Sequence, residues 1–367
     1  MKLIVQPRDG VTPLIAGIEE AKHSIEIVIF RFDRNDVERA LENAVARGVA
    51  VHALIAYLNR GGEKKLRKLE MRLLEAGVTV ARTSDDLIRY HDKLLIVDKK
   101  TLYVLAFNYT YLDIDHSRSF GVVTEDADAV KEALNLFAAD TQRKRYTAEL
   151  DNFVVSPVNA RQRLASFLEG ASRQLLIYDP KVSDRPMIKL LVDRAREGVD
   201  VRIIGRLTRR AEGVLVRDPA VHLHSRTIVR DGQEMFIGSQ SLSADELDAR
   251  REVGIIVGDQ AAIEEVIKTF EDDWAKQEAV PGEPEAEGES PAHKAAKKAV
   301  KAISKELPPV VPILEEAVRK AVGSAAEIKL DAELVEETVR GALKDAIRDV
   351  VKDAVQDAVE QQAPTRK

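Results

Sequence analysis

Apolar and polar positions follow one another in short blocks that predict strands and helices in turn. Near the N-terminus, the β-rich run 24–30 predicts a strand, the amphipathic run 35–47 a helix and the apolar run 49–55 a second strand. A strand, a helix and a strand in that order indicate a largely parallel sheet that is covered on both faces. An α/β fold is therefore expected.

The same plan occurs again in the second half of the chain. The runs 175–178, 187–196 and 198–204 repeat the strand, the helix and the strand. Around Gly48 the chain reads ARGVAV and around Gly198 it reads REGVDV, so the same helix end and strand start are used twice. Internal duplication of this kind predicts two similar α/β/α lobes that face each other across a pseudo-twofold axis.

The two halves differ in one segment. In the first half, 43 residues separate Gly48 from His91, whereas 26 residues separate Gly198 from His224 in the second. The second half is therefore expected to lack a counterpart of the charged helix predicted over 63–76.

Composition divides the chain into four parts. Two lobes are expected over 1–147 and 148–277, and the Pro-, Gly- and Glu-rich stretch 278–292 reads as an acidic flexible linker. The tail 293–367 begins with lysines and continues with apolar residues spaced three and four apart, which predicts α-helices. These helices could bind another copy of the chain, a partner protein, or an anionic surface.

Overall charge and residue usage narrow the function classes. The net charge of -6 argues against a surface built to wrap nucleic acid, and the absence of cysteine excludes disulfides and thiolate metal sites. Nowhere do about 18 apolar residues follow one another, as a membrane span requires. A cytoplasmic location is expected, and peripheral contact with the inner membrane face stays open.

The clearest chemical signal is a motif that occurs twice. His91 and Lys93 precede the apolar run 94–97, and His224 and Arg226 stand in the matching place of the second half. Side chains two residues apart on a strand point the same way, so each histidine lies beside a cation, as an anion site requires. Further polar residues recur in the same frame, with Asn108 and then Ser119 in the first copy, and Ser241 and then Glu252 in the second.

These residues resemble the phospholipase D superfamily, whose signature His-x-Lys-x4-Asp-x6-Gly-Ser-x-Asn is usually present twice. The resemblance covers roughly residues 1–276. It implies that the two motifs meet in one active site that cleaves a phosphodiester with no metal and no other cofactor. The implied catalytic residues are His91, His224, Lys93 and Arg226, and the implied phosphate-binding and supporting residues are Asn108, Ser239, Ser241 and Glu252.

The role of each histidine is argued in two ways. The resemblance makes His91 the nucleophile, because it belongs to the first motif. Ser119 and Glu252 follow the two motifs at the same spacing, and only Glu252 is a carboxylate. If Glu252 orients the histidine of its own half, it favours His224 as the nucleophile, and Ser119 then orients His91. We retain His91 as the expected nucleophile.

The motif also departs from the family pattern. Gly-Ser-x-Asn is replaced by Leu-Ala-Phe-Asn, ending at Asn108, in the first copy and by Gly-Ser-Gln-Ser, ending at Ser241, in the second, and Arg226 replaces a lysine. Asp98 and Asp231 lie at the far ends of the motif strands and are expected to be structural carboxylates that pair with a cation.

The expected function is that of a phospholipase D-type phosphodiesterase or phosphatidyltransferase that forms a phosphohistidine, with phospholipid as the favoured substrate. Cardiolipin synthase-type transfer and a nuclease of the same family are alternatives. A nuclease would need a basic groove with aromatic platforms, and aromatic residues make up 5% of this chain. A catalytically decayed, anion-binding scaffold is the alternative outside the enzymes.

Overall fold

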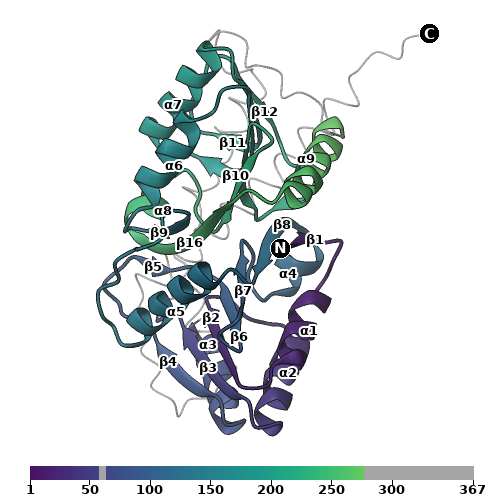
Figure 1. The fold of residues 1–367 in the computed structure, drawn as a ribbon, viewed down its shortest axis with the longest axis vertical. Helices are drawn as coiled ribbons and strands as arrows, with labels where there is room; N and C mark the ends of the chain where they lie inside the picture. The colour runs from purple at the N-terminus through teal and green to yellow at the C-terminus, as the bar shows by residue number, and fades with distance from the viewer. Residues whose placement is uncertain (58–62, 277–367) are drawn as a thin grey trace, which may run out of the picture. The chain divides into compact units, whose positions relative to one another are not determined.

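A computed structural model describes residues 1–57 and 63–276 (Figure 1). The linker and the helical tail predicted from the sequence lie outside the described residues. The lobe boundaries given above remain a prediction.

The first half forms a mixed sheet with helices along it. In chain order its elements are β1 (Lys2–Gln6), α1 (Thr12–Glu20), β2 (Ser24–Ile29), α2 (Asn35–Ala46), β3 (Ala50–Ile55), α3 (Glu63–Glu75), β4 (Thr79–Arg82), β5 (Arg89–Tyr90), β6 (Leu94–Val97), β7 (Thr101–Leu105), α4 (Tyr111–Asp115), β8 (Ser117–Thr124) and α5 (Ala127–Thr141).

The second half repeats this order. Its elements are β9 (Phe153–Ser156), α6 (Ala160–Glu169), β10 (Gln174–Val182), α7 (Arg185–Arg196), β11 (Asp200–Leu207), β12 (Val214–Arg217), β13 (His222–Leu223), β14 (Arg226–Arg230), β15 (Glu234–Gly238), α8 (Ala244–Asp248), β16 (Arg250–Val257) and α9 (Gln260–Ala275). Between β11 and β12 no helix corresponds to α3, so the predicted difference between the halves is confirmed.

Each sheet combines parallel and antiparallel pairs. The first sheet has the order β1-β8-β7-β6-β2-β3-β4, and along this order the β2–β3 and β3–β4 pairs are parallel and the other four are antiparallel. The second sheet has the matching order β12-β11-β10-β14-β15-β16, with β9 on β16. The expectation of a largely parallel sheet was wrong, because the motif strands β6 and β14 each turn back through a tight hairpin instead of crossing over through a helix.

Two short strands are exchanged between the sheets. β5, from the first half, pairs with β16 of the second sheet, and β13, from the second half, pairs with β8 of the first. Each exchanged strand immediately precedes a motif histidine, so each histidine begins its motif against the other lobe. The exchange determines which residues meet in the site.

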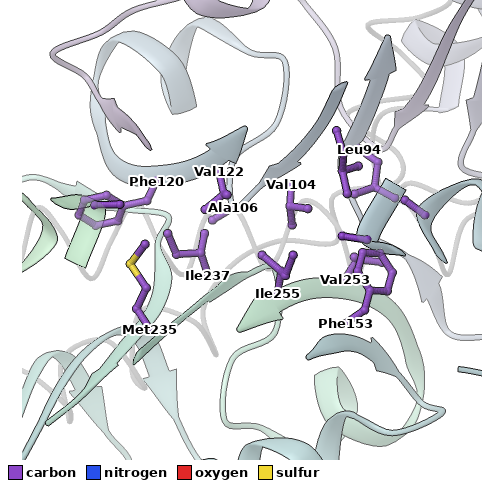
Figure 2. Close-up of a cluster of buried hydrophobic side chains, with 14 of the residues drawn as sticks. Leu94, Val104, Ala106, Phe120, Val122, Phe153, Met235, Ile237, Val253 and Ile255 are labelled. Atoms are coloured by element: carbon purple, nitrogen blue, oxygen red, sulfur yellow. The ribbon is translucent and has the colours of Figure 1, made fainter. Parts of the chain in front are cut away.

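Buried side chains fill three layers. The outer layers lie between each sheet and its helices, α1 to α3 in one lobe and α6 and α7 in the other. The central layer joins the inner faces of both sheets and also takes in residues of α5 and α9. Figure 2 shows this layer, where Val104 and Val122 of the first lobe face Ile237 and Ile255 of the second. Because the two lobes share this core, their motifs are held together by apolar burial.

Candidate active site

The first motif lies where β5 ends and β6 begins. The His91 backbone N–H donates to the Arg251 carbonyl at 2.8 Å, which continues the pairing of β5 with β16. The Lys93 ammonium donates back to the His91 carbonyl, and the Phe30 and His91 rings pack in a T-shaped contact with centroids 4.5 Å apart. The strand that follows is fully apolar and buried, so the polar residues cluster at its start.

The carboxylate that holds His91 comes from the other lobe. The Nδ1 atom of His91 lies 3.0 and 2.9 Å from the two carboxylate oxygens of Glu252, which is completely buried. A carboxylate only accepts, so Nδ1 carries the proton and Nε2 keeps its lone pair. The expectation that Glu252 supports His224 was wrong. The exchanged strand β5 sets His91, and not His224, beside β16.

The second histidine has no carboxylate on Nδ1. His224 Nδ1 donates to the backbone carbonyl of Ala106 at 2.8 Å, and the Asn108 amide lies 3.3 Å from Nε2. Ser119, which was expected to orient His91, is fully buried, and its hydroxyl has no hydrogen-bond partner among the residues that the structure describes. Both imidazoles therefore have Nδ1 bound by the protein, by a carboxylate in His91 and by a neutral carbonyl in His224.

The two rings lie close together. Their centroids are 6.3 Å apart. Burial, followed by the cations Lys93 and Arg226, keeps the pKa of His91 well below its usual range, and burial and Arg226 lower the pKa of His224 to about 3. Both histidines are neutral at pH 7 in the free protein.

The two cations flank this pair from the two motifs. Burial lowers the pKa of Lys93 to about 7, although the negative charge of Glu252 opposes that shift. Arg226 donates from Nε to the Ser241 hydroxyl at 3.2 Å and from Nη1 to the His224 carbonyl at 3.1 Å. Positive charge from both lobes is thus concentrated beside the imidazoles, as binding of a phosphate anion requires.

The remaining predicted residue, Ser239, contacts the strand that carries Glu252. The Val253 N–H donates to its hydroxyl at 3.1 Å, and Ser239 is fully buried. The structure therefore brings together His91, His224, Lys93, Arg226, Asn108, Ser241 and Glu252. Ser239 binds the backbone of the residue that follows Glu252.

Two carboxylates of the site were missed from the sequence. Asp113 accepts from the Asn108 side chain at 2.6 Å and lies 3.5 Å from His224 Nε2. Glu246 accepts from the Ser241 backbone N–H at 2.7 Å and lies 3.7 Å from Arg226. Each follows its polar partner by five residues, so the repeat frame contained the signal.

Among the described residues, the carboxylates of Asp98 and Asp231 bind backbone amides and no cationic side chain, so the expected pairing with a cation was wrong. Asp98 accepts from the N–H groups of residues 22, 23 and 24, and Asp231 accepts from those of residues 172, 173 and 174. Burial alone would raise the pKa of Asp98, but the amide hydrogen bonds outweigh it and lower the pKa. The two carboxylates tie the far end of each motif strand to the start of its neighbour.

Within residues 1–57 and 63–276, no group of three or more His, Asp or Glu side chains is arranged to hold a metal ion. In the same part of the chain, no helix combines the length and the apolarity needed to cross a bilayer.

Comparison with known proteins gives the family. A family profile described as "Cardiolipin synthase, PLD-like domain" matches residues 14–141 and 164–274, which is more than half of the chain. The minor cardiolipin synthase ClsB of Bacillus subtilis is 21% identical over 332 residues, which cover 76% of this chain and 82% of ClsB. Mitochondrial cardiolipin hydrolase of Mus musculus is 31% identical, with 35% of this chain and 56% of the hydrolase aligned.

A solved structure shares the fold over most of both chains. The phosphatidylserine synthase of Haemophilus influenzae superposes with a TM-score of 0.59 at 11% identity, and the match covers 83% of this chain and 93% of the synthase. The family profile confirms the resemblance expected from the paired motifs. The chain belongs to the phospholipase D-like family.

Proposed function

We propose that the protein is a phospholipase D-type phosphodiesterase or phosphatidyltransferase that acts on phospholipid through a phosphohistidine on His91. The observation that carries the proposal is the pair of imidazoles 6.3 Å apart, one of which is held at Nδ1 by a buried carboxylate. That carboxylate fixes the tautomer that leaves Nε2 free to attack and stabilises the imidazolium that forms. Only His91 has such a partner, which favours it as the nucleophile over His224.

In the first step, Nε2 of His91 attacks phosphorus, and the bond from phosphorus to the leaving alcohol breaks. His224 gives that alcohol a proton from Nε2. His224 is neutral in the free protein, so it must gain this proton as the anionic substrate binds, because a phosphate beside the ring raises its pKa. Lys93, Arg226 and the Asn108 amide stabilise the charge on the phosphoryl oxygens.

In the second step, His224 takes a proton from water or from an acceptor alcohol. The resulting oxygen nucleophile attacks phosphorus, and the bond to His91 breaks. Hydrolysis and transfer therefore share one intermediate and differ only in the acceptor. The names of ClsB and of the mitochondrial hydrolase refer to the synthesis and the hydrolysis of cardiolipin, and a phospholipid is the substrate class that both support here. A lipid substrate also favours peripheral contact with a membrane surface.

The test is turnover of bis-p-nitrophenyl phosphate in EDTA by the wild type, His91→Ala and His224→Ala. We expect continued release of p-nitrophenol by the wild type, none by His91→Ala, and no more than about one equivalent per enzyme by His224→Ala, at unchanged melting temperature. Vesicles of phosphatidylglycerol, with and without glycerol as acceptor, then separate hydrolysis from transfer, and single-stranded DNA is the comparison substrate. A folded wild type that turns over none of these substrates would contradict the proposal.

A further inference from the structure

Two ion pairs link the lobes at equivalent places, and the one at Arg251 is buried more deeply than the one at Arg118. Arg118 of β8, in the first lobe, binds Asp273 of α9, in the second, with distances of 2.6 and 3.0 Å. Arg251 of β16, in the second lobe, binds Asp140 of α5, in the first, at 3.0 Å. Each arginine also donates to a strand-end carbonyl, at Gln6 for Arg118 and at Ser156 for Arg251. The two pairs are counterparts in the repeat.

Each arginine also contacts a motif histidine through its backbone. The Arg251 carbonyl accepts from the His91 N–H at 2.8 Å, and the Arg118 carbonyl accepts from the His224 N–H at 3.1 Å. Each arginine thus links the lobes through its side chain and binds the motif histidine of the other lobe through its backbone carbonyl.

The two places differ in the residue that follows. After Arg251 comes Glu252, whose carboxylate holds His91 at 2.9 Å. After Arg118 comes Ser119, whose buried hydroxyl has no partner in the described part of the chain, while His224 is held by the Ala106 carbonyl. Only the link at Arg251 therefore leads to a side chain that touches a catalytic imidazole.

A second difference is the carboxyl group of Asp92. It is 2% exposed, its Oδ1 has no hydrogen-bond partner among the described residues, and it faces Arg251 and Asp140, with Lys93 and Tyr109 also near. Its counterpart, Ser225, is neutral and shares a hydrogen bond with Thr227. Burial raises the pKa of Asp92 to about 7 and that of Asp140 to about 6.

Arg251 thus lies against both carboxyl groups, and it also lies over the Tyr90 and Tyr146 rings, with centroids at 5.6 and 5.9 Å. Arg118, by contrast, faces one carboxylate, which also accepts from the Tyr178 hydroxyl at 2.8 Å. The carboxyl groups and aromatic rings around Arg251 therefore hold its guanidinium in one position.

We propose that Arg251, held across the lobe boundary by Asp140, is a positioning residue that sets Glu252 and His91 in their reactive geometry. The inference rests on the proposed function, because it assigns Arg251 a role only if His91 is the nucleophile. Arg251 does not touch the substrate. It acts through the carboxylate that follows it and through its own carbonyl.

The matched experiment compares Arg251→Lys with Arg118→Lys. Lysine keeps the charge but lacks the guanidinium fork that reaches the aspartate and the strand-end carbonyl together. We expect Arg251→Lys to lower kcat about tenfold to 100-fold with KM within about twofold, which is the usual effect of replacing a residue that orients another functional side chain. Arg118→Lys should leave kcat within about twofold. Because the Arg118 pair is less buried than the Arg251 pair, its melting temperature should fall by no more than that of Arg251→Lys.

The milder pair Asp140→Asn and Asp273→Asn provides a second readout if a lysine variant does not fold. Asp140→Asn weakens the hold on Arg251 and thereby loosens Glu252, which lowers the basicity of the His91 imidazole. The acid limb of kcat/KM should move to lower pH in Asp140→Asn and stay unchanged in Asp273→Asn.

Equal losses of kcat in both members of each pair, in proportion to their melting temperatures, would overturn the positioning role and leave two structural ion pairs. An inactive wild type would instead refute the proposed function, so the two failures are distinguishable.

Discussion

Replacing Glu252 by glutamine removes the negative charge that is hydrogen-bonded to His91 Nδ1. The carboxylate oxygens lie 2.9 and 3.0 Å from Nδ1 and Glu252 is 0% exposed, so water cannot replace the lost charge. Glutamine can still accept from Nδ1–H, which preserves the tautomer, but it cannot stabilise the imidazolium. We expect kcat to fall about 100-fold, which corresponds to about 2.7 kcal/mol of transition-state stabilisation.

Stability should not follow activity in this variant. Burial raises the pKa of Glu252, so the ionised carboxylate is costly in the folded state, although Lys93 opposes that shift. A neutral glutamine removes that cost, and the melting temperature of Glu252→Gln should be equal to or above that of the wild type. Steady-state kinetics on bis-p-nitrophenyl phosphate and thermal unfolding, measured on the same preparations, test both parts.

The control is Ser119→Ala, at the equivalent position of the first lobe. The Ser119 hydroxyl is buried and has no partner in the described residues, so its loss should change kcat by no more than about twofold. If Glu252→Gln kept wild-type kcat, or if Ser119→Ala lost as much activity as Glu252→Gln, the hydrogen bond from His91 to Glu252 of the other lobe would not contribute to catalysis.

Three further predictions concern other parts of the site. Asn108→Ala removes the amide 3.3 Å from His224 Nε2 and should lower kcat about tenfold in steady-state assays. Lys93 must be charged to bind the phosphate and its pKa is about 7, so kcat/KM should fall as the pH rises through about 7. The lowered pKa of His91 keeps this nucleophile neutral in mild acid, so the pH–rate profile should peak below pH 7. Asp98→Ala removes bonds from three amides and should cost about 2 kcal/mol in urea unfolding at pH 7 with kcat unchanged. The folded pKa of Asp98 is lowered, so this difference should be present above the unfolded value near 4 and vanish as pH falls through the folded pKa.

Much of the site could be predicted because the chain contains its motif twice. His91 and His224, and the cations two residues after them, are identified by their recurrence in one frame. The same frame also contains Asp113 and Glu246, five residues after Asn108 and Ser241, and a closer comparison of the halves would have found them.

The pairing of Glu252 could not be predicted in the same way. It depends on β5 and β13, two-residue strands that exchange between the sheets, and a pairing that short leaves no periodic pattern in the sequence. The partners of Asp98 and Asp231 were misjudged for a related reason. Every residue except proline has a backbone N–H, so the sequence does not show which amides a carboxylate binds. A carboxylate that binds amides therefore cannot be told from one that pairs with a cation.

The most direct test of the account is to identify the covalent intermediate. His224→Ala is incubated in EDTA with bis-p-nitrophenyl phosphate, whose leaving group needs no proton, so the first step proceeds and the second is slow. Peptide mass spectrometry after rapid quenching should find a p-nitrophenyl phosphoryl group on His91, and none when His91 is also replaced by alanine. A phosphoryl group on His224 in a matched His91→Ala experiment, or wild-type turnover that needs added metal and leaves His91 unmodified, would contradict the account.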